Sequence, residues 1–166
     1  MSDSDLPELI ELEDYNGDWD SYIDAVYELF KRDYVDNSPH FRGTRLGIKR
    51  HPEIDNREYT FYHMTHTGND EDNRKPDLRR CERIPWGKPT IENCDDWDLK
   101  VWEQKRNGEQ RICIWLEMED GLDYVIILNK RRGYLLPWTA FVMKHKHQKK
   151  KKLKEYKKWL EKAKGA

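Results

Sequence analysis

Two histidines stand three residues apart in the segment Phe61-Tyr62-His63-Met64-Thr65-His66. The segment is rich in threonine and aromatic residues, which predicts a strand over 59–65, and on a strand these histidines face opposite sides. No cysteine or carboxylate pair stands nearby to complete a metal site. His63 is a candidate general acid or base because the reference pKa of histidine lies near neutrality, although a single histidine is more often structural.

A cluster of arginines follows within a predicted helical turn over 77–83, which Pro85 closes. The cluster comprises Asp77, Arg79, Arg80, Glu82 and Arg83. The first and last arginines are four apart and share one face of the turn. Planar guanidinium groups bind phosphate and stabilise developing negative charge better than a solvated ammonium does. An internal lattice of ion pairs with the two carboxylates is an equally weighted alternative.

The elements that must position these side chains are strands. The region 99–143 predicts an antiparallel meander, in which Asn107-Gly108 is the dipeptide that a type I′ hairpin prefers. The predicted strands are Lys100–Arg106, Glu109–Met118, Tyr124–Leu128 and Tyr134–Met143. Pro137 in the last strand predicts an edge or a bulge, and a bulge would re-aim Thr139.

The hairpin also predicts which side chains share a face, because paired residue numbers must sum to 215 around the loop at 107–108. One face then carries Leu99, Val101, Ile112, Ile114 and Leu116. The other face carries Lys100, Trp102, Gln104, Arg111, Cys113 and Trp115. We expect the aliphatic face to pack on helices and the mixed face to be the solvated face that carries a site. A second layer under a loop or the closing helix is the alternative for the mixed face.

Two helices complete the predicted α+β fold: an N-terminal helix, a meander of about four to six antiparallel strands, and a basic C-terminal helix. An apolar stripe from Trp19 to Phe30 predicts an amphipathic helix that ends near Asp36, with Asp18 or Asp20 as N-cap. A short strand is expected around 41–48. The basic helix over 149–164 should dock through apolar residues at helical spacing, namely Leu153, Tyr156 and either Leu160 or Trp159.

The charge of the chain is distributed unevenly. The 166 residues carry a formal charge of −1, yet residues 1–40 hold twelve acidic and two basic side chains, and residues 144–166 hold eleven lysines and two glutamates. Such ends indicate either two solvated faces that attract one another or a basic arm aimed at an anionic partner such as nucleic acid. We expect an acidic flexible N-terminus over 1–17, a single domain over 18–148 and the docked basic helix over 149–166.

Composition excludes several classes of protein. Aromatic residues make up 12% of the chain, which argues against disorder, and no apolar stretch is long enough to span a membrane. The acidic start is no signal peptide, and three cysteines without metal-ligand spacing indicate reduced thiols in a cytoplasmic protein. Phosphate-binding loops, dinucleotide fingerprints and hydrolase elbows are absent from the sequence, so we expect no cofactor, no metal and no membrane partner.

Four segments carry a resemblance to a known family. They are Phe61-Tyr62-His63, Pro76–Ile84 with Trp86, Tyr134-Leu135-Leu136 and Trp138-Thr139-Ala140-Phe141. From about 41 to 155 the chain resembles an uncharacterised bacterial family described as phage-related. The strand motif of a hydroxyl, an alanine and an aromatic residue also resembles the phage-borne branch of the barnase–EndoU–colicin–RelE nuclease superfamily, in which helices precede a four-stranded antiparallel sheet.

The resemblance implies a metal-independent endoribonuclease of phage, mobile-element or toxin type, with an immunity or antitoxin protein as partner. The 2′-hydroxyl of RNA would attack its own phosphate and leave a 2′,3′-cyclic phosphate. The resemblance makes His63 the acid or base, Arg83 and Arg111 the phosphate ligands, and Thr139 the group that positions a water or phosphate oxygen. A catalytic glutamate would be Glu82 or Glu103, neither of which a specific motif places.

The remaining candidates would bind substrate. They are Arg79, Arg80, Trp102, Trp115 and Tyr134, and either tryptophan would serve as a platform on which a base stacks. The alternative function is a non-enzymatic accessory protein of phage origin that binds nucleic acid or another protein. The acidic first 40 residues favour this alternative, because their charge would imitate a nucleic acid or mask the basic tail. A nuclease should bring His63 and at least two arginines together in a concavity open to solvent.

Overall fold

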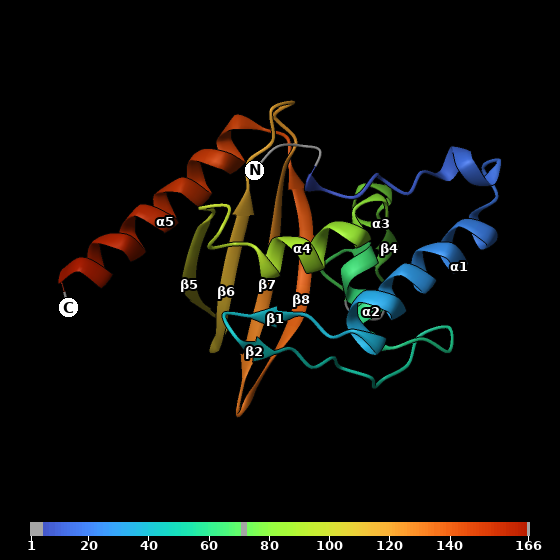
Figure 1. Ribbon diagram of the computed structural model, residues 1–166, viewed down its shortest axis with the longest axis horizontal. Coiled ribbons are helices and arrows are strands. Elements are labelled where there is room, and N and C mark those ends of the chain that lie inside the picture. Colours follow the sequence, from blue (N-terminus) through green and yellow to red (C-terminus); the bar gives the residue numbers. More distant parts are fainter. Residues whose placement is uncertain (1–4, 71–72, 166) are drawn as a thin grey trace.

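The computed structural model describes residues 5–70 and 73–165. It confirms the α+β fold: a four-stranded antiparallel sheet has the N-terminal helices on one face and the C-terminal helix on the other (Figure 1). The strands are β5 (Lys100–Arg106), β6 (Glu109–Leu116), β7 (Asp123–Arg131) and β8 (Tyr134–Met143). They follow one another in the order β5-β6-β7-β8, so β5 and β8 are the outer strands.

The predicted register of the first hairpin is confirmed. Lys100 pairs with Trp115 and Arg106 with Glu109, so every pair sums to 215. The two loop residues have φ angles of 52° and 77°, and such positive values are what a type I′ turn requires. Because directly opposed residues share a face, this register determines which side chains of β5 and β6 lie together.

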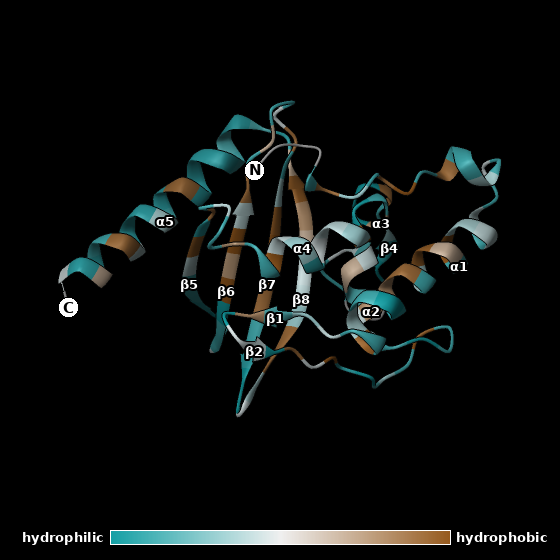
Figure 2. Cartoon of the chain, viewed as in Figure 1, coloured by the Kyte–Doolittle hydropathy of each residue, from teal (hydrophilic) through white to brown (hydrophobic). Residues whose placement is uncertain are grey.

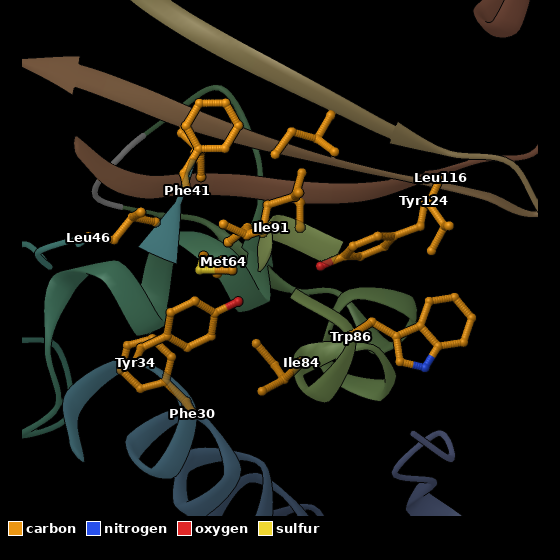
Figure 3. Packing of buried hydrophobic residues seen from close by; sticks show 14 of the residues in the cluster. Phe30, Tyr34, Phe41, Leu46, Met64, Ile84, Trp86, Ile91, Leu116 and Tyr124 are labelled. Carbon is orange, nitrogen blue, oxygen red and sulfur yellow. The ribbon is translucent and has the colours of Figure 1, made fainter. Parts of the chain in front are cut away.

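The aliphatic face of the sheet packs against the helices, as predicted (Figure 3). Helix α1 (Trp19–Phe30) contributes its buried stripe of Tyr22, Val26 and Phe30 to the same hydrophobic cluster as Ile114 of the sheet. Asp18 caps the helix by accepting a hydrogen bond from the backbone of Ser21 at 3.3 Å. The chain continues as the π-helix η3 (Lys31–Asp36), which agrees with the predicted end near Asp36.

The prediction of a strand over 59–65 is wrong, because this segment is the helix α2 (Tyr59–Thr65) with all seven residues buried. Burial on every side removes the pattern that would distinguish the two structures. Contacts distant in sequence stabilise the first turn: the Thr60 N–H donates to Lys49 O at 3.0 Å, and the Thr60 hydroxyl accepts from Lys49 N at 2.7 Å. These contacts override the modest strand preference of threonine and aromatic residues.

The prediction of a solvated mixed face is also wrong for its central residues. Trp102, Cys113 and Trp115 are 1%, 0% and 4% exposed and form a second hydrophobic cluster with strand β7. Helix α5 (Lys146–Gly165) covers this cluster with Leu153, Tyr156 and Trp159, which are the predicted docking residues. Figure 2 shows a few hydrophobic segments spaced along α5, which is otherwise hydrophilic. The alternative of a second layer under the closing helix therefore holds here.

The remaining elements are short. The predicted strand around 41–48 is a hairpin of two two-residue strands, and the predicted helical turn over 77–83 is the helix α3, N-capped by Asp77. In chain order these elements are η2 (Leu12–Tyr15), β1 (His40–Phe41), β2 (Thr44–Arg45), β3 (His66–Thr67), β4 (Lys75–Pro76), α3 (Leu78–Glu82), η4 (Ile84–Trp86) and α4 (Gly87–Glu92). No helix within the described ranges is both long and apolar enough to cross a membrane.

The acidic N-terminal segment packs on the helical layer. Leu6 is buried, and the backbone N–H of Ile10 donates to Glu82 O at 3.1 Å. The indole of Trp86 donates to Pro7 O, and the hydroxyl of Tyr22 donates to Ile10 O, each at 2.8 Å. These bonds position the segment before α1 along α3 and η4.

Gly87 lies where α4 approaches the core most closely. A Cβ atom there would overlap the hydroxyl of the buried Tyr34 and lie 3.3 Å from Ile126. Alanine normally raises helix stability relative to glycine by about 0.8–1 kcal/mol. We expect Gly87→Ala to do the opposite and lower the free energy of unfolding by about 1–3 kcal/mol, as overpacked cores do. Urea denaturation measures this change, with Gly165→Ala as the control because a Cβ there meets nothing within 4 Å.

Candidate functional site

A groove of about 630 Å³ lies between the mixed face of the sheet, α3 and α5. Its walls carry six basic side chains and one acidic side chain, Glu155. The basic residues are Arg80, Lys105, Arg106, Arg111, Lys151 and Lys152. The groove begins where the hydrophobic contact of α5 ends, so part of the mixed face is solvated although its centre is buried.

Arg80 connects the helical layer to the groove. Its guanidinium donates from Nη1 to the Thr139 hydroxyl at 2.9 Å and to His66 O at 3.1 Å, and its Nε lies 3.2 Å from a carboxylate oxygen of Asp77. The side chain is only 12% exposed, and this burial lowers the pKa of Arg80 from its usual value. These three contacts fix the position of the guanidinium, so an anion would bind to it in one defined orientation.

A bulge in β8 places Thr139 beside Arg80, which confirms the prediction drawn from Pro137. The register with β7 shifts, because Ile127 pairs with Thr139 and Leu128 with Pro137, which leaves Trp138 as an extra residue. Thr139 thereby joins the cross-strand row of Ile127 and shares the face of the groove. β8 is also an outer strand, where a proline costs no hydrogen bond of the sheet.

Arg111 belongs to a polar cluster on the same face. The Arg111 guanidinium and the Asn129 amide both donate to Oε2 of Glu109, at 3.0 and 3.1 Å. Burial acts to raise the pKa of Glu109, but these two hydrogen bonds and the charges of Arg111 and Arg131 lower it overall. The carboxylate is therefore ionised at neutral pH and lies beside a groove of opposite charge.

His63 lies next to the bulge but is enclosed. It projects from α2, is 5% exposed, and its ring centroid lies 4.2 Å from that of Trp138. Its Nδ1 lies 2.7 Å from the carbonyl oxygen of Trp138, so that nitrogen carries the proton. Its Nε2 faces Nη1 of Arg74 at 3.4 Å. His63 is thus next to Arg74, an arginine that does not line the groove. Our prediction that His63 lies on a strand is wrong, because it lies on the helix α2.

Arg79 and Arg83 point away from the groove. Arg83 is 3% exposed, donates to Glu82 at 3.2 Å and lies over the ring of Trp86 at 5.1 Å. Arg79 is exposed and forms an ion pair with Glu82 at 2.8 Å. These two arginines therefore form the predicted lattice of ion pairs, and neither lines the groove with Arg111.

The predicted aromatic platforms lie outside the groove. Trp102 and Trp115 are buried under α5 and present no free ring face, so the expectation that a base stacks on either one is wrong. Tyr134 is 50% exposed but lines a different pocket, next to Phe41 and Arg42. Neither predicted carboxylate lines the groove: Glu82 is buried between arginines, and Glu103 forms an ion pair with Lys130.

Several groups at this site were not predicted, namely His66, Arg74, Glu109, Asn129 and Arg131. Extending the pairing rule from β6 to β7 would have placed Asn129 opposite Arg111. No such rule connects Arg74 to the site, since it follows a loop whose conformation the sequence does not specify.

Neither a family model, nor a curated protein, nor a solved structure matches the chain. Within residues 5–70 and 73–165, no group of three or more metal-ligating His, Cys, Asp or Glu side chains lies together. What the site can bind therefore follows from its own geometry and charge.

Glu109 makes the stability of the folded protein depend on pH. Because its folded pKa is lowered, its contribution to stability is complete above its unfolded pKa of about 4.3 and is lost as pH falls through the folded value. We expect Glu109→Gln to lower the free energy of unfolding near neutral pH by about 0.2–1 kcal/mol and to leave it nearly unchanged near pH 3. Urea denaturation at several pH values measures this difference. The exposed Glu119, replaced by Gln, is the control, and an equal effect of both variants at neutral pH would contradict the prediction.

Proposed function

We propose that the groove between the sheet and α5 binds the phosphate backbone of RNA. This proposal rests on the charge of the groove lining, which has six basic side chains and one acidic side chain. Fixed guanidinium groups of Arg80 and Arg111 suit individual phosphates, while Lys151 and Lys152 add attraction that tolerates different positions of the strand. The resemblance to RNA-cleaving proteins favours RNA over DNA.

Cleavage of the bound RNA is the second candidate, and the Glu109–Arg111 pair favours it: Arg111 lines the groove, and Glu109, which is not itself a lining residue, accepts a hydrogen bond from Arg111. An ionised carboxylate can take the proton of a 2′-hydroxyl as that oxygen attacks the adjacent phosphorus. The new bond joins the 2′-oxygen to phosphorus, the bond to the 5′-oxygen breaks, and that leaving oxygen takes a proton from water. Arg80 and Arg111 would stabilise the charge on the phosphate, which requires no metal. The product is a 2′,3′-cyclic phosphate.

His63 has a limited place in this proposal. Its enclosed ring positions the bulge through Trp138 O, and the bulge positions Thr139 beside Arg80. Three arginines, Arg80, Arg106 and Arg111, line a groove open to solvent, but His63 does not line it. This arrangement supports binding more directly than cleavage.

The proposal includes a cytoplasmic location, which the state of the cysteines supports. The three cysteines, Cys81, Cys94 and Cys113, are free and buried, and burial raises the pKa of Cys81 and of Cys113 to about 12. Inert reduced thiols suit a cytoplasmic protein. A toxin-type nuclease also requires an immunity or antitoxin protein, so an adjacent gene of that kind would support cleavage.

Binding can be tested through its dependence on salt. We expect the double variant Lys151→Gln, Lys152→Gln to bind single-stranded RNA more weakly. The slope of log affinity against log salt should fall by about 0.7 for each phosphate that the variant no longer neutralises, because fewer counterions are released. Fluorescence anisotropy of a labelled RNA measures both quantities. The matched control replaces the exposed Lys144 and Lys154, which lie outside the groove, and equal slopes in the two variants would contradict the proposal.

Cleavage can be tested separately. We expect Glu109→Gln to reduce the rate of RNA cleavage by about 10²–10⁴ while RNA affinity stays similar, because the carboxylate acts on the proton and not on the phosphate. Gel analysis of a labelled RNA measures the rate, EDTA should leave it unchanged, and a 2′-deoxy substitution at the cleaved position should abolish it. His63→Ala in the same assay tests its predicted role as acid or base. Tight binding by the wild-type protein with every RNA left intact would reject cleavage and retain binding.

A further inference from the structure

The two oppositely charged parts of the chain lie at opposite ends of the molecule. Along the longest axis, η2 and α1 lie at one end and the C-terminal end of α5 lies at the other (Figure 1). η2 and α1 therefore do not cover the end of the basic helix in the same chain. Each charged surface is left to interact with solvent or with another molecule.

The acidic end has a groove of about 560 Å³ between η2 and α3. Glu11, Glu13, Leu12 and Leu78 line it, and Arg79, its basic lining residue, is already paired with Glu82. Between residues 8 and 28, the exposed acidic side chains that form no ion pair within the described ranges are Glu8, Glu11, Glu13, Asp14, Asp18, Asp20 and Glu28. Hydrogen bonds from Ile10 and Tyr22 keep this segment in place, so the acidic groove is fixed to the body of the protein.

The basic end is the last part of α5, which extends past the outer strand β5 (Figure 1). Lys157, Lys158 and Lys162 are exposed there and have no ion-pair partner in the part of the chain that the structure describes. Leu160 lies in the same turns and is only partly buried, whereas Trp159 packs on the sheet of its own chain. The helix end thus presents the same combination of charge and apolar surface as the acidic groove, with the opposite sign.

We infer that the end of α5 of one copy docks in the acidic groove of a second copy. The lysines face Glu11 and Glu13, and Leu160 contacts Leu12 and Leu78. Two copies that lie side by side in opposite directions make this contact twice, which closes a symmetric dimer. A second copy is the favoured occupant because both complementary surfaces are present on every chain, whereas contact between two acidic ends or two basic ends is repulsive.

This contact is separate from the proposed RNA groove. The RNA groove uses Lys151 and Lys152, whereas the dimer contact uses lysines beginning one to two turns later on the helix. Variants of the outer lysines therefore test dimer formation without removing a residue that lines the RNA groove. The inference holds whether or not the protein binds RNA.

Salt dependence is the first test. Light scattering on the full chain should give twice the chain mass at about 0.1 M salt and the chain mass at about 1 M, where the screening length falls from about 10 Å to about 3 Å. A monomer at both salt concentrations would overturn the inference and leave these surfaces to other partners. A mass that keeps rising with protein concentration would overturn the closed, symmetric arrangement.

Charge reversal provides the decisive test. One triple variant carries Glu11→Lys, Glu13→Lys and Asp14→Lys, and the other carries Lys157→Glu, Lys158→Glu and Lys162→Glu. Each variant alone should be monomeric at low salt, because its two ends then have the same sign. An equimolar mixture should form a dimer, since both contacts between unlike variants are attractive.

The control is Glu53→Lys with Glu119→Lys, which changes exposed acidic residues outside the groove and should leave the dimer intact. Circular dichroism and a thermal melt of each variant establish that it is folded. Folded triple variants that stay dimeric alone, or a mixture that stays monomeric, would overturn the inference.

Discussion

The structure depends on covering both faces of one four-stranded sheet. The helical layer covers the aliphatic face, and α5 covers the mixed face with three partly buried side chains. The second cover is narrower than the sheet, because a single helix contributes only a single apolar stripe. The polar side chains beyond the edge of α5 stay solvated and form the basic groove. The site therefore exists where the hydrophobic cover of the sheet ends.

The bulge in β8 connects the two layers. Trp138 is the extra residue, and its carbonyl oxygen receives a hydrogen bond from His63 on the helical side. The next residue, Thr139, accepts from Arg80 on the groove side. One irregularity in an outer strand thus holds a histidine and an arginine of different helices at fixed positions. Loss of the bulge would shift the register of Thr139 by one residue and turn its side chain to the opposite face.

The fold could be predicted in the segments where hydrophobic residues recur at the spacing of a strand or a helix. The alternation in 99–118, the dipeptide Asn107-Gly108 and the stripe of α1 are local signals, and the structure confirms each of them. Helix α2 has no such signal, because all its residues are buried and hydrogen bonds with Lys49 and Arg50 stabilise its start. The strand preference of its residues is a local property, and distant contacts determined the outcome.

The site could be predicted only in part, for a related reason. Sequence spacing placed three arginines on one short helix, but Arg80 alone reaches the groove, because an N-cap at Asp77 orients the turn and Arg83 is held in the interior. Because Trp102 and Arg111 share the mixed face, we predicted one environment, exposure to solvent, for both side chains. Which of them is buried depends on how far α5 extends across the sheet, and no pattern within the strands encodes that.

Net charge says little about the electrostatics of this protein. A formal charge of −1 arises from two large opposite charges at the two ends of the molecule, so the chain is a strong dipole and not a neutral particle. Such a dipole orients an approaching polyanion toward α5 and the groove before contact, and it keeps the acidic end turned away. The same field favours opposed alignment of two copies. The proposed association with RNA and the proposed association between copies therefore depend on one feature of the sequence, the separation of its charges, although they use different lysines of α5.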